Sequence, residues 1–273
     1  MQIGFNLFDR IVAQMPGLKL KLLQAGMFDE PVGFVRKSGM TALYMGSAVM
    51  FVLFVIFDKL GITLLPLFIL LPVVILLLFA FFLRAPDVII LKRQKGISKE
   101  IVFAGRFIII ELESGVPLYK TFINVARSYD IIGIYFKEII DNVNIGTSME
   151  DALGEAAENV PSPDLRKIFW QILNSMRTGT DVTNSLNSVI DQITREQQIM
   201  VKEYGRKLNP LAMFYMMTAV ILPSLGMVLV MILSTFMGLQ LPLSILLILT
   251  AGLGFIQLMF VNMIKSSRPP VEL

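Results

Sequence analysis

Three long stretches of the chain contain no charged side chain. They cover residues 38–57, 60–83 and 208–264, which are 20, 24 and 57 residues long. About 20 apolar residues are enough to carry a helix across the hydrocarbon core of a bilayer. The first two stretches therefore predict one transmembrane helix each. The third predicts two helices joined by a turn at 237–242, where Gly238 and Pro242 interrupt the pattern.

Residues 84–207 instead alternate short amphipathic segments with Gly and Pro. This punctuation predicts helices over 98–114, 118–129 and about 132–143, and a fourth capped by Thr147 or Ser148. A fifth helix runs from Pro163 to Gly179. Its apolar residues follow the spacing of one helix face: Leu165, Ile168, Phe169, Ile172, Leu173 and Met176.

A sixth helix is predicted to start near Thr180, and no helix breaker follows before Pro210. We expect it to continue as one stalk into the third span. Six helices joined by short loops are typical of a compact bundle of up-and-down neighbours. The predicted fold is therefore an all-α integral membrane protein, in which a cytoplasmic six-helix bundle is inserted between spans two and three of four transmembrane helices.

This pattern divides the chain into five parts. They are amphipathic helices at 1–37, transmembrane helices 1 and 2 at 38–83, the helical domain at 84–207, transmembrane helices 3 and 4 at 208–264, and a tail at 265–273. Apolar and charged positions alternate over residues 5–28. That segment is predicted to lie at the membrane surface or to pack on the large domain as an ordinary helix.

Nearly all the basic residues that flank the spans lie on one side. The loop between the first two spans carries only Asp58 and Lys59, and the loop between the last two carries no charge. By the positive-inside rule, both termini and residues 84–207 face the cytoplasm, and the protein is a multi-pass protein of the cell (inner) membrane. The basic residues on that side include Arg36, Lys37, Arg84, Lys92, Arg93, Lys95, Lys99, Arg206, Lys207, Lys265 and Arg268.

Composition supports the membrane assignment and excludes several kinds of chemistry. Mean hydropathy is +0.71, and only 16% of residues are charged. The chain has no His and no Cys. This excludes imidazole bases, thiolate nucleophiles, disulfides and zinc fingers. The net charge of +3 is small, and residues 84–207 hold 16 basic and 16 acidic side chains, so we expect no nucleic-acid partner.

No catalytic, cofactor or metal site is predicted. The chain lacks the G-x-x-x-x-G-K-[ST] motif of a P-loop. Carboxylate pairs such as Glu150/Asp151 and Glu155/Glu158 have the spacing of solvated helix faces, so we predict that the protein is not an enzyme.

The predicted spans contain no ionisable residue, whereas ion-coupled transporters usually need one within the bilayer. They do contain pairs of small residues four apart, which permit close helix packing. These are Ala42/Gly46, Ser234/Gly238 and Thr250/Gly254. The basic run 92–95 either binds anionic lipid headgroups or serves only to orient the protein.

Three segments of the central domain resemble the type II secretion system F domain, which occurs in inner-membrane platform proteins of type II secretion, type IV pili, archaella and Tad pili. They read LESGVPL at 112–118, GTSMEDAL at 146–153 and IL-x-SM-x-x-GTD at 172–181. Many bacterial members have Gly-Glu where this chain has Gly179, Thr180 and Asp181. The LLQAGM segment at 22–27 resembles the region ahead of the first span in Tad-type members.

This resemblance implies a non-enzymatic platform for assembly of a type IV pilus-like filament or a type II secretion pseudopilus. A cytoplasmic secretion ATPase hexamer would dock on the F domain, and pilin or pseudopilin helices would contact the spans. A single F domain implies a homo-oligomer or a heterodimer with a paralogue. The candidate ATPase contacts are polar loop positions, which otherwise serve only as helix stops: Glu113, Gly115, Pro117, Gly146, Ser148, Glu150, Gly179, Thr180 and Asp181.

Three alternatives remain at this point. A small multi-pass transporter or permease is disfavoured by the uncharged spans and the large central domain. A membrane-anchored enzyme would have only carboxylates and hydroxyls available. A sporulation-type scaffold of the same family would be distinguished by neighbouring genes, since a platform needs an ATPase and prepilins.

Overall fold

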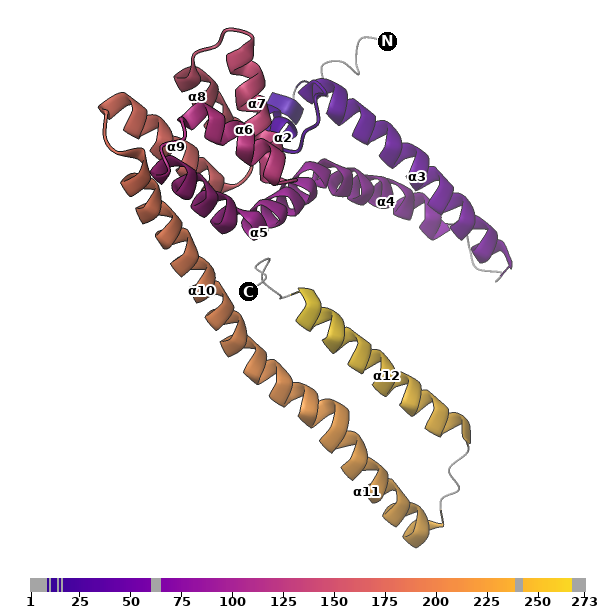
Figure 1. Ribbon diagram of the computed structural model, residues 1–273. Coiled ribbons are helices and arrows are strands. Elements are labelled where there is room, and N and C mark those ends of the chain that lie inside the picture. Colours follow the sequence, from indigo (N-terminus) through magenta and orange to yellow (C-terminus); the bar gives the residue numbers. More distant parts are fainter. Residues whose placement is uncertain are drawn as a thin grey trace. The chain divides into compact units, whose positions relative to one another are not determined.

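The computed structural model describes residues 17–59, 65–238 and 243–266, together with Asp9, 11–13 and Met15. Only helices and connecting turns occur in these residues (Figure 1). The all-helical part of the predicted fold is therefore confirmed. The chain divides into two compact units, Met1–Ile190 and Asp191–Leu273, and the division falls inside helix α10.

In the first unit, α3 (Pro31–Lys59) and α4 (Leu65–Leu83) lie side by side as an antiparallel pair. One stripe of α3 is buried, and it contains Ser38, Ala42, Gly46 and Met50. A Cβ atom added to Gly46 would lie 2.7 Å from Cγ1 of Ile75 on α4. The predicted Ala42/Gly46 pair thus lies where the two helices approach closely.

Helix α2 (Leu18–Gln24) packs against the start of α3. Leu18 and Leu22 form a buried cluster with Phe34 and Val35. The Nζ atom of Lys21 also lies 2.8 Å from a carboxylate oxygen of Asp87 on α5. This segment therefore packs on the rest of its unit, and contact with a membrane surface stays a prediction. Much of the predicted 1–37 region lies outside the described residues.

The central helices are α5 (Ala85–Glu113), α6 (Leu118–Ser128), α7 (Ile132–Asn144), α8 (Met149–Asn159), α9 (Pro163–Thr178) and α10 (Val182–Tyr215). Helices α6 to α9 begin within one residue of their predicted starts. The predicted start of the first helix at residue 98 is wrong, because α5 already begins at Ala85. Pro86 is tolerated in the first turn, and Gly96 packs against the side chain of Ile131.

Three phenylalanines hold α6, α7 and α9 together. The rings of Phe122 and Phe136 are 5.0 Å apart and those of Phe136 and Phe169 are 5.3 Å apart, both in edge-to-face geometry. All three side chains are fully buried. The predicted apolar face of α9 is also buried except at Met176, which is half-buried. This core fixes how the α6–α7 and α8–α9 pairs meet.

Helix ends in this unit are satisfied by side chains. Ser148 and Ser162 accept hydrogen bonds from backbone N–H groups in the first turns of α8 and α9, and Ser148 is one of the two caps predicted for α8. The carboxylate of Glu100 on α5 accepts hydrogen bonds from the N–H groups of Ile131 and Ile132 at the start of α7, at 3.1 and 2.9 Å. Glu100 therefore ties α5 to α7.

The second unit contains the end of α10, a π-helical segment η1 (Met216–Ile221), α11 (Leu222–Met237) and α12 (Leu243–Ser266). Helix α10 continues through Pro210, as the predicted continuous stalk required. Gly238, with φ 64°, ends α11 at the predicted turn, and the rest of that turn, 239–242, lies outside the described residues. The hydroxyl of Tyr204 donates a hydrogen bond to the carbonyl of Ile264 on α12.

Within the residues that the structure describes, three helices are long and apolar enough to cross a membrane. They are Pro31–Lys59 (α3), Leu70–Glu113 (α4 continued by α5) and Val182–Met237 (α10, η1 and α11 in succession). The described apolar part of the last helix, Thr250–Ile264, is shorter. The protein is thus all-helical with at least three membrane-capable helices, and the fourth span stays a prediction.

Candidate docking site at the helix tips

The three turns singled out by the sequence share one backbone design. Each begins with a glycine in the left-handed region, namely Gly115 (φ 81°), Gly146 (φ 103°) and Gly179 (φ 68°). In the first two turns, the residue after the glycine donates a backbone hydrogen bond to a carbonyl of the preceding helix. These bonds run from the N–H of Val116 to the carbonyl of Glu111 and from the N–H of Thr147 to the carbonyl of Asn142. Glycine adopts this conformation without the steric cost that other residues carry.

The second half of each turn begins the next helix. The hydroxyl of Ser148 accepts a hydrogen bond from the N–H of Asp151, at 3.1 Å. The carboxylate of Asp181 accepts hydrogen bonds from the N–H of Thr183, at 2.9 Å, and from the side chain of Asn184, at 2.7 Å. The glycines, Ser148 and Asp181 therefore have structural roles as helix stops and caps. Those roles are compatible with docking but do not require it.

Two side-chain contacts bring the three turns to one end of the domain. The hydroxyl of Tyr119 donates a hydrogen bond to the side-chain oxygen of Asn144, 2.8 Å away, which links the first turn to the second. Nε of Arg177 lies 3.4 Å from Oε2 of Glu150, which links the second turn to the third. We call residues 113–117, 145–150 and 178–181 the tip surface.

All nine predicted contact residues lie on the tip surface. Eight are exposed, and Glu150, which pairs with Arg177, is half-buried. Ile145 is 81% exposed between polar neighbours. Among the described residues, no group of three or more acidic side chains is placed to hold a metal ion. The arrangement offers hydroxyls, carboxylates and an apolar side chain for contact with another protein.

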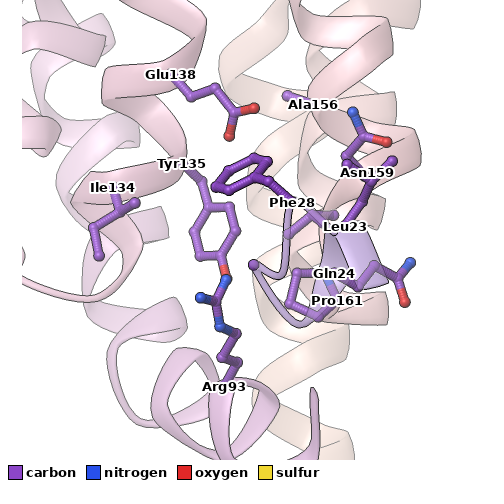
Figure 2. A pocket seen from close by; sticks show the side chains of 12 residues that line it. Leu23, Gln24, Phe28, Arg93, Ile134, Tyr135, Glu138, Ala156, Asn159 and Pro161 are labelled. Carbon is purple, nitrogen blue, oxygen red and sulfur yellow. The ribbon is translucent and has the colours of Figure 1, made fainter. Parts of the chain in front are cut away.

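A small cavity lies at the other end of α7 and α8, where α2 meets them (Figure 2). It has a volume of about 290 Å³, and its lining includes Phe28, Arg93, Tyr135 and Glu138. The phenol of Tyr135 points at the guanidinium of Arg93. Gly26 makes room for that guanidinium, because an added Cβ would overlap Nη2 of Arg93.

Burial is the main influence on the titration of two groups at this cavity. It raises the pKa of the Tyr135 phenol, against the opposing effect of Arg93. It also raises the pKa of the Glu138 carboxyl, and the negative charge of Glu155 on α8 adds to that rise. Glu138 and Glu155 therefore repel each other on neighbouring helices.

Sequence reasoning did not find the side chains that connect the turns. Tyr119, Asn144 and Arg177 belong to none of the motifs, and their partners lie 25 or 27 residues away along the chain. The cavity was also missed, because it forms only where α2 packs against α8 and α5. One signal for the position of the turns was available in the sequence. Consecutive helices of a bundle alternate in direction, so every second turn is expected at the same end of the domain.

The fold and the tip surface define a class before any comparison. This is an all-helical protein with membrane-capable helices and a central helical domain whose three glycine turns lie exposed at one end, within the residues that the structure describes. Residues 106–230 match the family model described as type II secretion system (T2SS), protein F. Residues 106–230 are therefore a domain of the type II secretion system F family, as the motifs in this region indicated.

Proteins of this family are membrane platform proteins of secretion and pilus-type systems and are generally not enzymes. The family domain and the apolar helices together indicate an inner-membrane protein. No curated protein and no solved structure matches the chain.

Proposed function

We propose that the chain is a non-enzymatic platform that couples a cytoplasmic secretion ATPase to pilin or pseudopilin subunits during assembly of a type IV pilus-like filament or a type II secretion pseudopilus. The match of residues 106–230 to the protein F family carries this proposal. The membrane-capable helices before and after the central domain support it.

The proposed topology has four spans, with both termini and residues 84–207 in the cytoplasm. The distribution of basic residues supports this orientation. A cytoplasmic bundle of six helices would then be held by spans on both sides. Pilin helices would contact the spans, where small residues such as Gly46 already permit close packing.

The tip surface is the proposed contact for the ATPase. Three turns from distant parts of the sequence meet there, and they are joined by the Tyr119–Asn144 and Arg177–Glu150 contacts. Such a surface is held in shape by backbone hydrogen bonds that close the first two glycine turns and by the Asp181 cap in the third. A partner would therefore meet a preorganised site.

Helix α10 is the proposed mechanical link to the third span. It is a single helix of 34 residues that continues into η1 and α11. A continuous helix resists bending more than a loop does, so displacement of one end is passed along it. If Gly205→Pro leaves filament assembly intact, this link is wrong.

Site-specific cross-linking tests the platform function. The chain has no Cys, so Thr180→Cys on the tip surface and Asp130→Cys in the turn between α6 and α7 provide single attachment points. Both residues are exposed, but they belong to turns at opposite ends of the domain. Each variant is labelled with the same photo-cross-linker in native membranes.

The proposal expects the secretion ATPase to be captured from residue 180 and not from residue 130. Equal capture from both positions would show that the tips are not the docking site. Absence of capture from either, with the ATPase present and the protein folded, would contradict coupling through this domain.

A further inference from the structure

The charges of the central domain balance in number but are separated in space. One side of α5 exposes a row of residues three or four apart, which we call the basic face. Lys92, Lys95 and Arg106 of this row form no ion pair within the described part of the chain. Phe103 and Ile110 between them are 64% and 61% exposed. The basic face consists of Lys92, Lys95, Lys99, Phe103, Arg106 and Ile110.

The outer side of α7 and α8 has the opposite charge, and we call it the acidic face. Its carboxylates are Glu138, Asp141, Asp151, Glu155 and Glu158. In the described residues, none of the five forms an ion pair.

Repulsion from Glu155, added to burial, raises the pKa of the Glu138 carboxyl. This repulsion would be relieved by a cation brought from outside. The acidic face therefore has unpaired negative charge that the rest of its own unit does not neutralise.

Exposed apolar side chains lie beside these carboxylates. Phe28 is 91% exposed and Ile134 is 64% exposed, and both line the cavity of about 290 Å³ that Glu138 also borders (Figure 2). The basic face thus carries projecting apolar side chains, and the acidic face carries a hollow with an apolar rim. The two faces are complementary in charge, and each carries exposed apolar side chains.

The two faces also lie at matching levels along the domain. Glu100 on α5 bonds to the start of α7, and Gln94 on α5 donates a hydrogen bond to the carbonyl of Pro161, just after α8. Helices α5 and α7 both end at the tip surface, so Glu138, six residues after Ile132, lies about 9 Å along α7 toward the tips, as Arg106 lies six residues past Glu100 on α5.

Helix α8 runs in the opposite direction, which places Glu155 near the level of Lys99 and Glu158 near that of Lys95. Copies that share one orientation in a membrane would therefore bring opposite charges together without tilting.

We propose that the basic face of one copy docks on the acidic face of a neighbouring copy in the same membrane. A second copy is the occupant that covers both faces at once, because it brings the missing charge to each. The interface is heterologous, so repeated docking builds a ring or an open array rather than a closed two-fold dimer. The inference rests on the proposed function only in assuming that all copies have the same membrane orientation.

Charge reversal with rescue tests this interface. Full-length protein is reconstituted without ATPase or pilin, and its self-association is measured over a concentration series. Arg106→Glu and Glu138→Arg each replace an attraction by a repulsion and should weaken association about tenfold. The double variant R106E/E138R restores opposite charges across every interface and should recover most of the loss. Arg127→Glu, on α6 and outside both faces, is the matched control and should have no effect.

Disulfide trapping identifies the pairing directly, because the wild-type chain has no Cys. Mixed samples of Arg106→Cys and Glu138→Cys should form a cross-linked dimer on oxidation, and neither variant should do so alone. Cross-linking of Arg106→Cys with itself would show two-fold pairing and overturn the proposal. A wild-type protein that stays monomeric, or a double variant as weak as the single ones, would also overturn it.

These measurements contain no ATPase, so they fail independently of the platform function. Capture of the ATPase from residue 180 without self-association would leave the platform function supported and the interface wrong. Self-association through the two faces without ATPase capture would support the interface and show that the proposed platform function is wrong.

Discussion

Replacing Gly133 by alanine tests a close approach between α6 and α7. A Cβ atom at this position would lie 2.8 Å from the carbonyl oxygen of Ala126 and 3.3 Å from its carbonyl carbon. Both are backbone atoms of α6, so no side-chain rotation relieves the contact and the helices must move apart. Overpacking of this kind costs about 1–3 kcal/mol. Alanine regains up to about 1 kcal/mol of helix propensity, which leaves a net loss of up to about 2 kcal/mol.

Gly154→Ala is the matched control, since it makes the same chemical change inside α8. Its added Cβ would meet only Cδ2 of Leu173, at 3.9 Å, which is an ordinary contact. We expect this variant to be more stable than the wild type by about 0.5–1 kcal/mol. The two identical changes should therefore shift stability in opposite directions.

Urea unfolding of the full chain in detergent measures both variants. Trp170 on α9 is the single tryptophan and reports on this domain through its fluorescence. The urea midpoint should fall for Gly133→Ala and rise for Gly154→Ala. A Gly133→Ala protein that gains as much stability as Gly154→Ala would refute the close packing of α6 on α7.

Three further predictions use the same unfolding measurement. Glu100→Ala removes the acceptor for two backbone N–H groups at the start of α7 and should cost about 1–2 kcal/mol; an unchanged midpoint would contradict this role. The pKa of Glu138 is raised in the folded protein. Ionised Glu138 therefore lowers the free energy of unfolding at a pH above its folded pKa, whereas below its unfolded pKa the carboxyl is protonated in both states and has no such effect. Glu138→Gln should therefore stabilise at about pH 7.5, by less than about 1 kcal/mol after solvent screening, and have no effect at about pH 3; equal gains at both would refute the argument. Gly46→Leu should lower the urea midpoint by forcing α3 away from Ile75, whereas Gly33→Leu, whose added Cβ meets nothing within 4 Å, should not; similar losses at both glycines would contradict the α3–α4 contact.

Local sequence signals predicted the helix limits well where they act within a few residues. Gly115, Gly146 and Gly179 each end a helix because a left-handed residue stops the i→i−4 pattern. Ser148 and Ser162 begin helices because their hydroxyls accept free backbone N–H groups. The location of the candidate site at one end of the domain follows from these limits and from the alternation of helix directions.

Features that depend on distant contacts could not be read from the sequence. The start of α5 at Ala85 has local signals in Pro86 and Asp87, but Gly96 interrupts the pattern and is accommodated by packing against Ile131. The cavity needs α2 to meet α7 and α8, and the separation of charge appears only when the helices are assembled. Motifs likewise identified the tip glycines but not the Tyr119–Asn144 contact that joins two of the turns.

The most direct test of the platform account is the compartment that the tip surface faces. A single cysteine at Thr180 is labelled with a membrane-impermeant reagent in intact cells and again after permeabilisation. The account predicts labelling only after permeabilisation, because a secretion ATPase can reach the tips only from the cytoplasm. Labelling of residue 180 in intact cells would contradict the orientation and the ATPase-docking function that depends on it.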